Sequence, residues 1–188
     1  MPAIIALPAR TGTAANPSTT TVTPAPGEGR VEMSTDRTFE DFEVGQTFET
    51  GGRTATEADI RMFVGATGST DRIHVDHDYA EAHPLVDDVV MHGTLTLAIT
   101  DGLLADEIAQ DAALAMNYGH DGVRYLGPVY PGDTLTATAE VTETREKGED
   151  WGVVVTDVEV KNGDGETVLV ETHRFLVATA DHPALSEQ

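Results

Sequence analysis

The sequence predicts an α+β fold, with helices in the first half of the chain and an antiparallel meander of strands in the second. Apolar residues in the first half recur every three or four positions, which is typical of helices that face a core. In the second half, apolar and polar residues alternate with a period of two, as they do in half-buried strands. Separate blocks of helices and strands favour α+β over a doubly wound sheet, in which the two alternate.

With 188 residues, the chain suits one domain. No internal repeat is visible, which predicts one copy of the fold per chain. Residues 1–35 are rich in Thr, Pro, Ala and Gly, and we expect a disordered tail there because this composition buries little apolar surface. Met33 is a second candidate start, in which case residues 1–32 are not translated. The folded domain is expected at residues 36–180, followed by a C-terminal tail at 181–188.

Three helices are expected between residue 56 and about residue 113. Thr56 with Asp59 three residues later predicts a capped helix that ends at Gly68. Residues 78–81 predict a short second helix. The longest helix is expected from residue 93 to about residue 113, with an apolar stripe in its first turns and polar residues at its far end.

Strands are expected on both sides of these helices. Residues 38–54 predict an extended segment at the start of the domain. Residues 134–141 alternate strictly between polar and apolar, and residues 153–160 and 167–177 predict two further strands. Residues 162–165 read Asn-Gly-Asp-Gly, which favours a tight hairpin between the last two strands.

The chain is strongly acidic. It carries 33 acidic and 11 basic residues, for a net charge of -22. Such a surface repels nucleic-acid phosphates and anionic membranes, so neither is expected as a partner. The acidic excess resembles that of proteins from salt-in halophiles, in which salt screens the repulsion among carboxylates.

The composition also limits the available chemistry and the location. There are no cysteines, which excludes disulfides, thiol catalysis and cysteine metal ligands. No apolar run approaches the roughly 20 residues that a membrane helix needs. Residues 1–8 lack the charged start of a signal peptide. We therefore expect a cytoplasmic protein.

Titratable residues gather in one short segment before the longest helix. A neutral histidine beside a carboxylate can activate water near neutral pH, because the unperturbed pKa of histidine lies in that range. The segment therefore predicts an acid–base site, with its candidates within nine residues: Ser69, Asp71, His74, Asp76 and His77.

A His92-Gly93 step follows this segment and opens the longest predicted helix. The first backbone N–H groups of a helix lack intrahelical acceptors and lie at its positive end. The amides of Gly93 and Thr94 are therefore candidates to stabilise an oxyanion. We expect His92 to pack or hydrogen-bond beside the helix start.

These motifs resemble the signature of the MaoC-like hydratases, relatives of the (R)-specific enoyl-CoA hydratases. That family shows a D-x-N-P-x-H-x-D loop, a short helical stretch and then a His-Gly step, which correspond here to residues 69–76, 79–80 and 91–93. Residues 123–133 are similar to the family's V-R-F-x-x-P-V-x-P-G-D, and residues 39–45 to its F-x-D-x-x-V-G. The resemblance covers roughly residues 38–178.

The resemblance implies a single hotdog fold, in which an antiparallel sheet wraps around the central helix. It also implies a homodimer with a continuous sheet and a CoA cleft at the interface. The expected reaction adds water reversibly to a 2-enoyl-CoA, giving a 3-hydroxyacyl-CoA, with acyl-CoA as the substrate and no cofactor. His74 would hold and activate the water, and Gly93 would bind the enolate-like oxygen.

The sequence departs from the family at one position. Ser69 stands five residues before His74, where the family has its catalytic aspartate. Asp71 stands where the family usually has asparagine, so a carboxylate is present but displaced. Asp71 is the provisional catalytic partner, with a loop-bracing role as the alternative. Ser69 is expected to be a loop hydrogen-bonder or a substrate contact rather than a nucleophile.

Two other functions stay open from the sequence. A hotdog thioesterase would need a carboxylate to direct water at the thioester carbonyl, which Asp71 or Asp76 could supply. A non-catalytic acyl-thioester-binding protein would explain the missing aspartate. Arg72 and Arg124 are candidate contacts for CoA phosphates.

No metal site is expected. His74 and Asp76 would share one face of a strand while His77 points away from it. The remaining histidines are expected to be isolated surface or packing residues: His83, His120, His173 and His182.

The charge pattern yields a test of salt dependence. The melting temperature should rise with potassium chloride concentration, because salt screens the repulsion among the 33 acidic side chains. Thermal unfolding followed by circular dichroism measures this. A highest melting temperature at low salt would contradict the halophilic interpretation.

Overall fold

The computed structural model describes residues 37–109 and 112–185. The tail expected at residues 1–35 lies outside the described residues, as do the last three residues of the expected C-terminal tail. Among residues 181–185, Pro183–Leu185 form a short 3₁₀ turn.

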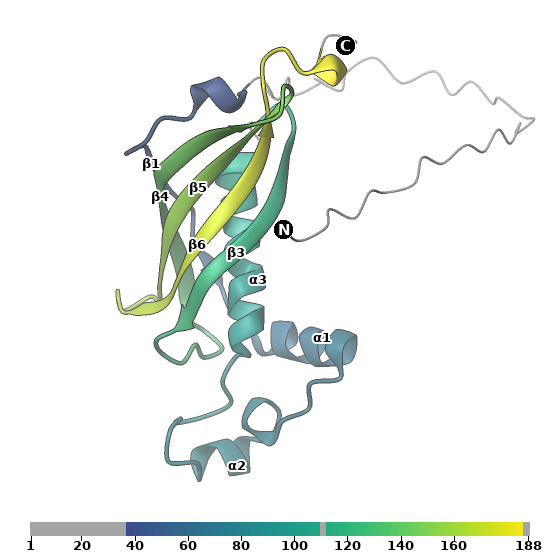
Figure 1. Cartoon of the computed structure of the whole chain (residues 1–188). Helices are drawn as coiled ribbons and strands as arrows, with labels where there is room; N and C mark the ends of the chain where they lie inside the picture. Colours follow the sequence, from purple (N-terminus) through teal and green to yellow (C-terminus); the bar gives the residue numbers. More distant parts are fainter. Residues whose placement is uncertain (1–36, 110–111, 186–188) are drawn as a thin grey trace, which may run out of the picture. The chain divides into compact units, whose positions relative to one another are not determined.

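The fold is built on one antiparallel sheet, with strands in the order β1-β4-β5-β6-β3 (Figure 1). The short strand β2 pairs with β4 beside β1. The strand bounds are β1 Thr47–Glu49, β2 Arg53–Thr54, β3 Ala115–Tyr125, β4 Thr134–Lys147, β5 Trp151–Lys161 and β6 Thr167–Ala178.

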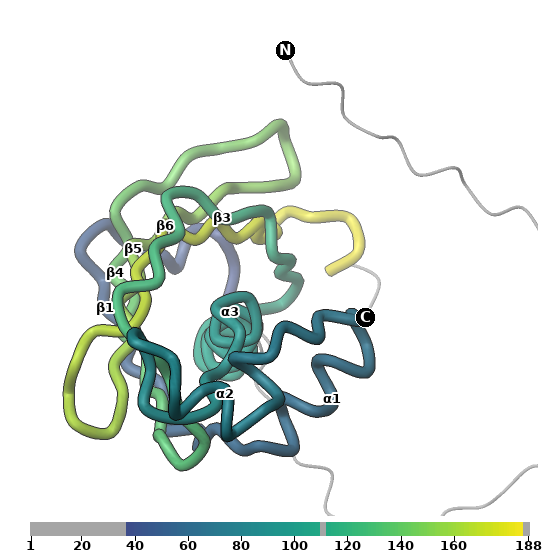
Figure 2. Tube along the Cα trace, turned by 90° about the horizontal axis from the view of Figure 1, so that it is seen from below, coloured from purple at the N-terminus to yellow at the C-terminus, as the bar shows by residue number. Residues whose placement is uncertain are grey.

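The α-helices lie between β2 and β3 in the chain: α1 Glu57–Thr67, α2 His77–Glu81 and α3 Gly93–Leu104. Figure 2 shows α3 inside the curve of the sheet, and Figure 1 shows α1 beside the first turns of α3 and α2 beyond its N-terminal end. This arrangement confirms the predicted α+β class and the expected wrapping of a sheet around the central helix.

The core lies between α3 and the concave face of the sheet. Alternate residues of β4 are fully or almost fully buried, as the period of two predicted. They pack in one cluster with the apolar stripe of α3. Burial of each large apolar side chain contributes about 1.5–3 kcal/mol. The main contributors from these two elements are Leu95, Ile99, Leu103, Leu135, Ala137, Ala139 and Val141.

The prediction for the longest helix was wrong at its end. Regular α-helix stops at Leu104, and a π-helical turn covers Ala105–Ala109. Ala112 then forms a bridge with Arg37 instead of continuing the helix. The apolar pattern could not show this change, because Ile108 follows Leu104 at helical spacing and both are fully buried.

Two strand predictions also needed correction. Residues 38–54 form a 3₁₀ turn at Phe39–Asp41 and two short strands rather than one extended segment. Strand β3 was not predicted, because Asn, Gly and Asp residues interrupt its alternation. Its register with β6 shifts between Asn117 and Gly119 and again between Asp121 and Arg124.

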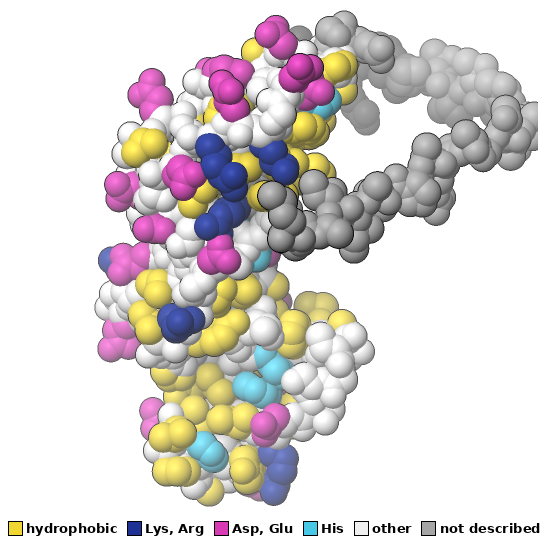
Figure 3. All heavy atoms as spheres, viewed as in Figure 1, with side chains coloured by type: hydrophobic (Ala, Val, Ile, Leu, Met, Phe, Trp, Pro, Cys, Tyr) yellow, Lys and Arg dark blue, Asp and Glu magenta, His cyan; other side chains and the backbone are white. Residues whose placement is uncertain are grey.

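The edge strand β3 exposes apolar side chains. Figure 3 shows hydrophobic side chains gathered toward the lower end of the molecule beside histidines, while acidic side chains spread over the upper part. An edge strand with apolar side chains is typical of a surface that pairs with another strand. About half of the surface of each of four side chains on β3 and just after it is exposed: Met116, Tyr118, Tyr125 and Leu126.

None of the described helices has both the length and the apolar character that crossing a membrane requires.

Helix α1 ends immediately before the predicted site loop. Thr56 and Asp59 form the predicted capping box, in which the Asp59 amide donates to Thr56 Oγ1 at 3.2 Å and the Thr56 amide donates to Asp59 Oδ2 at 2.8 Å. Gly68 ends the helix at a φ of 71°, a left-handed conformation that favours glycine. Helix α2 begins at His77, with Asp76 as its N-cap.

An ion pair strengthens the start of α1. Arg53 Nη2 lies 2.7 Å from Asp59 Oδ1, and Asp59 is buried. The hydrogen bond from Arg53, aided by Thr56, lowers the pKa of Asp59 to about 2. The ionised carboxylate therefore stabilises the fold above the unfolded pKa near 3.8, and this contribution is lost as the pH falls through about 2.

Replacing Asp59 with asparagine should lower the free energy of unfolding by about 1–2 kcal/mol at pH 7, since the cap and the ion pair both weaken. Because the guanidinium of Arg53 is half-exposed, solvent screens the ion pair, and the loss of unfolding free energy is smaller than the pKa shift of Asp59 alone would give. Urea unfolding at several pH values measures it. The difference between the two proteins should shrink as the pH approaches 2, and equal stability at pH 7 would contradict the assignment.

Candidate active site

The chain brings the two predicted histidine motifs together. His74 lies in the 3₁₀ turn Arg72–His74, and His92 is the N-cap residue of α3. Their rings stack with centroids 3.7 Å apart and an interplanar angle of 25°. Phe63 of α1 packs on His92 with a centroid distance of 4.9 Å. The aromatic contacts therefore hold His74 beside the first turn of α3.

The hydrogen bond of His74 sets its tautomer. His74 Nδ1 lies 2.6 Å from the carbonyl oxygen of Val90. Because a carbonyl oxygen can only accept, the Nδ1 atom of the neutral ring carries the hydrogen. The lone pair is then on Nε2, where it can accept a proton from water. The half-buried ring has the form that a general base requires.

His92 is held in the opposite tautomer. Its Nε2 lies 3.1 Å from the carbonyl oxygen of Ser69, so Nε2 carries the hydrogen. Burial lowers the pKa of His92, while the Ser69 carbonyl raises it to a smaller extent. Within the described residues its buried Nδ1 has no hydrogen-bond partner. His92 is therefore neutral at neutral pH and supports His74 through packing.

The first amides of α3 are available to a ligand. Leu95 and Thr96 both donate their backbone N–H to the His92 carbonyl, at 2.9 and 3.0 Å. No acceptor for the amides of Gly93 or Thr94 occurs among the described residues. Both amides lie at the positive end of the helix, where developing negative charge is stabilised.

Gly93 is required by the close approach of Tyr125. A Cβ atom built on Gly93 would lie 2.9 Å from three ring atoms of Tyr125. Tyr125 belongs to the second predicted motif, and a further contact joins the two motifs: the Met91 amide donates to the Val129 carbonyl at 2.8 Å. The downstream motif therefore shapes the surroundings of the α3 N-terminus.

Asp71 and Ser69 lie at the edge of this arrangement. The exposed Asp71 side chain accepts a hydrogen bond from the Ile73 amide at 3.4 Å, which caps the 3₁₀ turn. Its charge also acts on His92, whose pKa it raises slightly against the effect of burial. No hydrogen bond joins Asp71 to the His74 ring within the described part of the chain. Ser69 is half-buried and contributes its backbone carbonyl to His92.

The other charged residues of the loop are engaged elsewhere. Asp76 caps α2 and pairs with Arg72 Nη2 at 2.8 Å, and the Arg72 guanidinium lies over the Tyr79 ring. His77 Nδ1 lies 2.7 Å from Asp88 Oδ1, and this carboxylate raises the pKa of His77. The loop thus separates His74, Asp76 and His77 rather than gathering them. Arg124, the second candidate for CoA phosphates, donates to the Val123 carbonyl.

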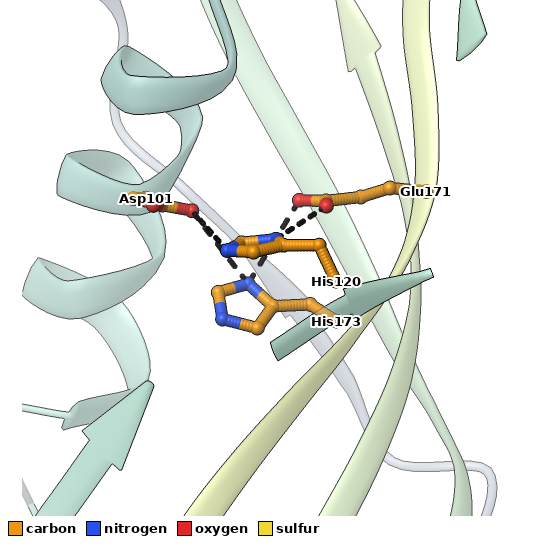
Figure 4. A group of neighbouring side chains, drawn as sticks. All are labelled: Asp101, His120, Glu171 and His173. Carbon is orange, nitrogen blue, oxygen red and sulfur yellow. Dashed lines mark hydrogen bonds and ion pairs between the residues drawn. The ribbon is translucent and has the colours of Figure 1, made fainter. Parts of the chain in front are cut away.

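The prediction that His120 and His173 are isolated was wrong. Their ring centroids are 4.3 Å apart, and they form a cluster with Asp101 and Glu171 (Figure 4). One signal was available in the sequence, because a period of two in residues 167–177 places Glu171 and His173 on the buried face of a strand. His120 gave no such signal, since its strand was not predicted.

Solved structures define the class of the fold. A monoamine oxidase regulatory protein from Archaeoglobus superimposes with a TM-score of 0.70 at 33% identity, over 76% of this chain and 95% of that one. A Mycobacterium tuberculosis protein with a double hotdog fold gives a TM-score of 0.66 at 18% identity, over 77% of this chain and 45% of that one. The chain is a hotdog-fold protein.

The sequence then defines the family. Residues 40–163 match the family described as the MaoC like domain. Since this match covers more than half of the chain, the chain belongs to the MaoC-like family.

Two of three curated relatives have names from thioester chemistry. An (R)-specific enoyl-CoA hydratase of Rhodospirillum rubrum is 32% identical over 104 residues, which are 55% of this chain and 69% of that protein. A 3-hydroxyacyl-thioester dehydratase of Mycobacterium tuberculosis is 31% identical over 122 residues, or 63% of this chain and 80% of that one. Protein MaoC of Klebsiella aerogenes is 35% identical over 97 residues, 52% of this chain but only 28% of its own length.

Substituting alanine at Gly93 tests the contact with Tyr125. The added methyl group should lower the free energy of unfolding by about 1–3 kcal/mol, because the ring must move away. Urea unfolding measures the loss. Tyr125→Ala removes the ring, so Gly93→Ala should cost much less in that background. Equal costs in both backgrounds would contradict the contact.

Proposed function

We propose that this protein adds water reversibly to a 2-enoyl thioester, giving a 3-hydroxyacyl thioester. The observation that carries the proposal is the tautomer of His74, whose Nε2 lone pair lies beside the first turn of α3 in a MaoC-like chain. Relatives named as hydratase and dehydratase support the same reaction class. A hydro-lyase needs a base for water and a donor for an enolate oxygen, and we assign these roles to His74 and to the N-terminus of α3.

In the proposed reaction, His74 Nε2 removes a proton from water as the hydroxyl oxygen bonds to the β-carbon. The electrons of the carbon–carbon double bond move toward the thioester carbonyl, whose oxygen becomes enolate-like. The imidazolium then returns a proton to the α-carbon. The net change is the addition of one water molecule, and the dehydration follows the same steps in reverse.

The enolate-like oxygen is assigned to the N-terminus of α3. The amide of Gly93, assisted by that of Thr94, is positioned to donate to it. The contact between the Gly93 backbone and Tyr125 keeps one side of this position apolar. An apolar ring beside this position strengthens hydrogen bonds to the developing charge, because it lowers the local dielectric constant.

Asp71 is assigned as the carboxylate partner. It follows the serine that occupies the family's aspartate position, and its charge already acts on the stacked histidine pair through His92. In this role it orients the attacking water and stabilises the imidazolium of His74. Ser69 has a hydroxyl that can hydrogen-bond the water or the substrate but cannot act as a carboxylate base.

The substrate class is proposed to be acyl-CoA, with no cofactor. A relative named beta-methylmalyl-CoA dehydratase, from Chloroflexus aurantiacus, is 30% identical over 148 residues, which are 78% of this chain and 37% of that protein. It supports a CoA carrier. A cytoplasmic location is proposed with this chemistry.

A homodimer is proposed through the β3 edge of the sheet. The edge strand has apolar side chains that are about half exposed, including Met116, Tyr118 and Tyr125. Pairing β3 with the same strand of a second copy would extend the sheet and cover these side chains. Since Tyr125 also contacts Gly93, this interface would border the proposed thioester site.

A non-catalytic acyl-thioester-binding function is the second candidate. Ser69 in place of aspartate and the capping role of Asp71 favour it. Thioester hydrolysis is a third outcome that the same substrates can reveal through release of free thiol.

The test measures hydration of crotonyl-CoA by the wild type and matched variants in high potassium chloride. Hydration is followed as the loss of the enoyl-thioester absorbance. His74→Ala should reduce kcat/KM by about 10²–10⁴-fold, the usual contribution of a general base. Asp71→Asn should also lose most turnover, although its amide oxygen can still cap the turn. His77→Gln is the matched loop control and should stay near the wild type.

Near-wild-type hydration by a folded His74→Ala variant would contradict the assignment of the base. Full activity in Asp71→Asn would show that Asp71 caps the 3₁₀ turn and has no catalytic role. A wild type that binds short and branched enoyl-CoAs without turnover would establish the binding function instead.

A further inference from the structure

A cluster of metal-ligating side chains lies inside the domain, separate from the proposed thioester site. Asp101 comes from α3, His120 from β3, and Glu171 and His173 from β6 (Figure 4). Asp101 is eight residues after Gly93, which places it about 12 Å further along the helix axis. The cluster therefore joins the central helix to two neighbouring strands.

The ligand atoms converge on one small region. His120 Nε2 lies 3.6 Å from Asp101 Oδ1, and His173 Nδ1 lies 3.9 Å from the same oxygen. Glu171 Oε1 lies 3.8 Å from His173 Nδ1. A tetrahedral zinc ion with bonds of about 2.0–2.1 Å separates its ligand atoms by roughly 3.3 Å. Small side-chain movements would therefore bring these atoms to coordination distance.

Several of these atoms lack any other hydrogen-bond partner. Glu171 and His173 are almost completely buried, with side chains 0% and 1% exposed. Glu171 Oε1, Asp101 Oδ1 and both ring nitrogens of His173 are buried without a hydrogen-bond partner in the described part of the chain. Buried polar groups left in this state cost about 1–3 kcal/mol each, which a bound cation would offset.

The remaining hydrogen bonds match the surroundings of a metal ligand. His120 Nδ1 lies 2.6 Å from Glu171 Oε2, so a carboxylate orients the ring and leaves the lone pair on Nε2, which lies 3.6 Å from Asp101 Oδ1. A histidine ligand commonly donates its second N–H to a carboxylate in this way. The Asn117 side-chain amide donates to His120 Nε2 at 2.9 Å and to Asp101 Oδ2 at 3.4 Å, and a bound cation would take the place of the first of these hydrogen bonds.

The charge state of the cluster agrees with this arrangement. Burial raises the pKa of both Asp101 and Glu171, and it lowers the pKa of His173 to about 3. His173 is therefore neutral at neutral pH, the form in which imidazole binds metals. Two carboxylates held together without a cation repel each other, so a divalent ion would stabilise both in the ionised form.

We propose that Asp101, His120, Glu171 and His173 bind a divalent transition-metal ion of the zinc class. The mixed imidazole and carboxylate ligands suit such an ion better than calcium or magnesium, which prefer oxygen alone. The ion fixes α3 against β3 and β6. It does not contact the thioester site, so the proposal is independent of the hydratase activity.

The experiment is a calorimetric titration of the metal-free full chain with Zn²⁺. The buffer contains high potassium chloride and excess Mg²⁺, which occupies surface carboxylates. One Zn²⁺ should bind per chain. Zn²⁺ at about 100 times Kd should raise the melting temperature by about 5–10 °C, because the ion binds only the folded state. Co²⁺ should give the intense visible bands of a tetrahedral site.

Matched variants locate the ion. His120→Gln and His173→Gln should weaken Zn²⁺ binding by about ten-fold or more, after circular dichroism has shown that each is folded. His120→Gln is the milder change, since His120 is partly exposed. His77→Gln is the control, because His77 lies with Asp88 and Glu57 in an exposed cluster that could also attract metal.

Three outcomes would overturn the proposal: no stoichiometric Zn²⁺ binding by the wild type, unchanged binding in both folded cluster variants, or loss of binding in His77→Gln alone. A fourth contradicting result would be a Co²⁺ spectrum typical of hydrated octahedral ions. The wild-type titration and spectrum decide the question even if His173→Gln does not fold.

Discussion

The packing of α3 against the concave face of the sheet is the interaction on which the rest of the structure depends. Leu95, Ile99 and Leu103 lie in the same buried cluster as the inward residues of β4. This burial fixes the direction of the helix and therefore the position of its N-terminal amides. A helix N-terminus at the edge of a packed core can remain open to a ligand while its later turns stay dry.

Carbonyl oxygens then organise the histidines at this N-terminus. Val90 accepts from His74 Nδ1, and Ser69 accepts from His92 Nε2, so the stacked rings hold opposite tautomers. Neither arrangement uses a charged partner for the ring hydrogen. In the neutral ring, a backbone carbonyl that accepts from Nδ1 leaves the lone pair of His74 on Nε2. In the proposed reaction, the carboxylate of Asp71 would act on the imidazolium of His74.

The same helix also faces a polar region within the core. Asp101 interrupts the mostly apolar contact between α3 and the sheet, opposite Glu171 and His173. In a purely structural core, buried titratable groups without partners reduce stability. Their convergence from separate elements is therefore more consistent with a bound ion than with packing. The ion would reinforce the contact that positions the α3 N-terminus.

Local sequence determined the elements whose signals are short-range. The capping box at Thr56 and Asp59, the glycine at position 68 and the alternation in β4 act over a few residues, so they could be predicted. The approach of His74 to His92 could be expected only through the family resemblance. Tertiary structure alone decided the end of α3, the existence of β3 and the meeting of Asp101 with His120, Glu171 and His173. These depend on strand register and packing between distant segments, which local periodicity does not encode.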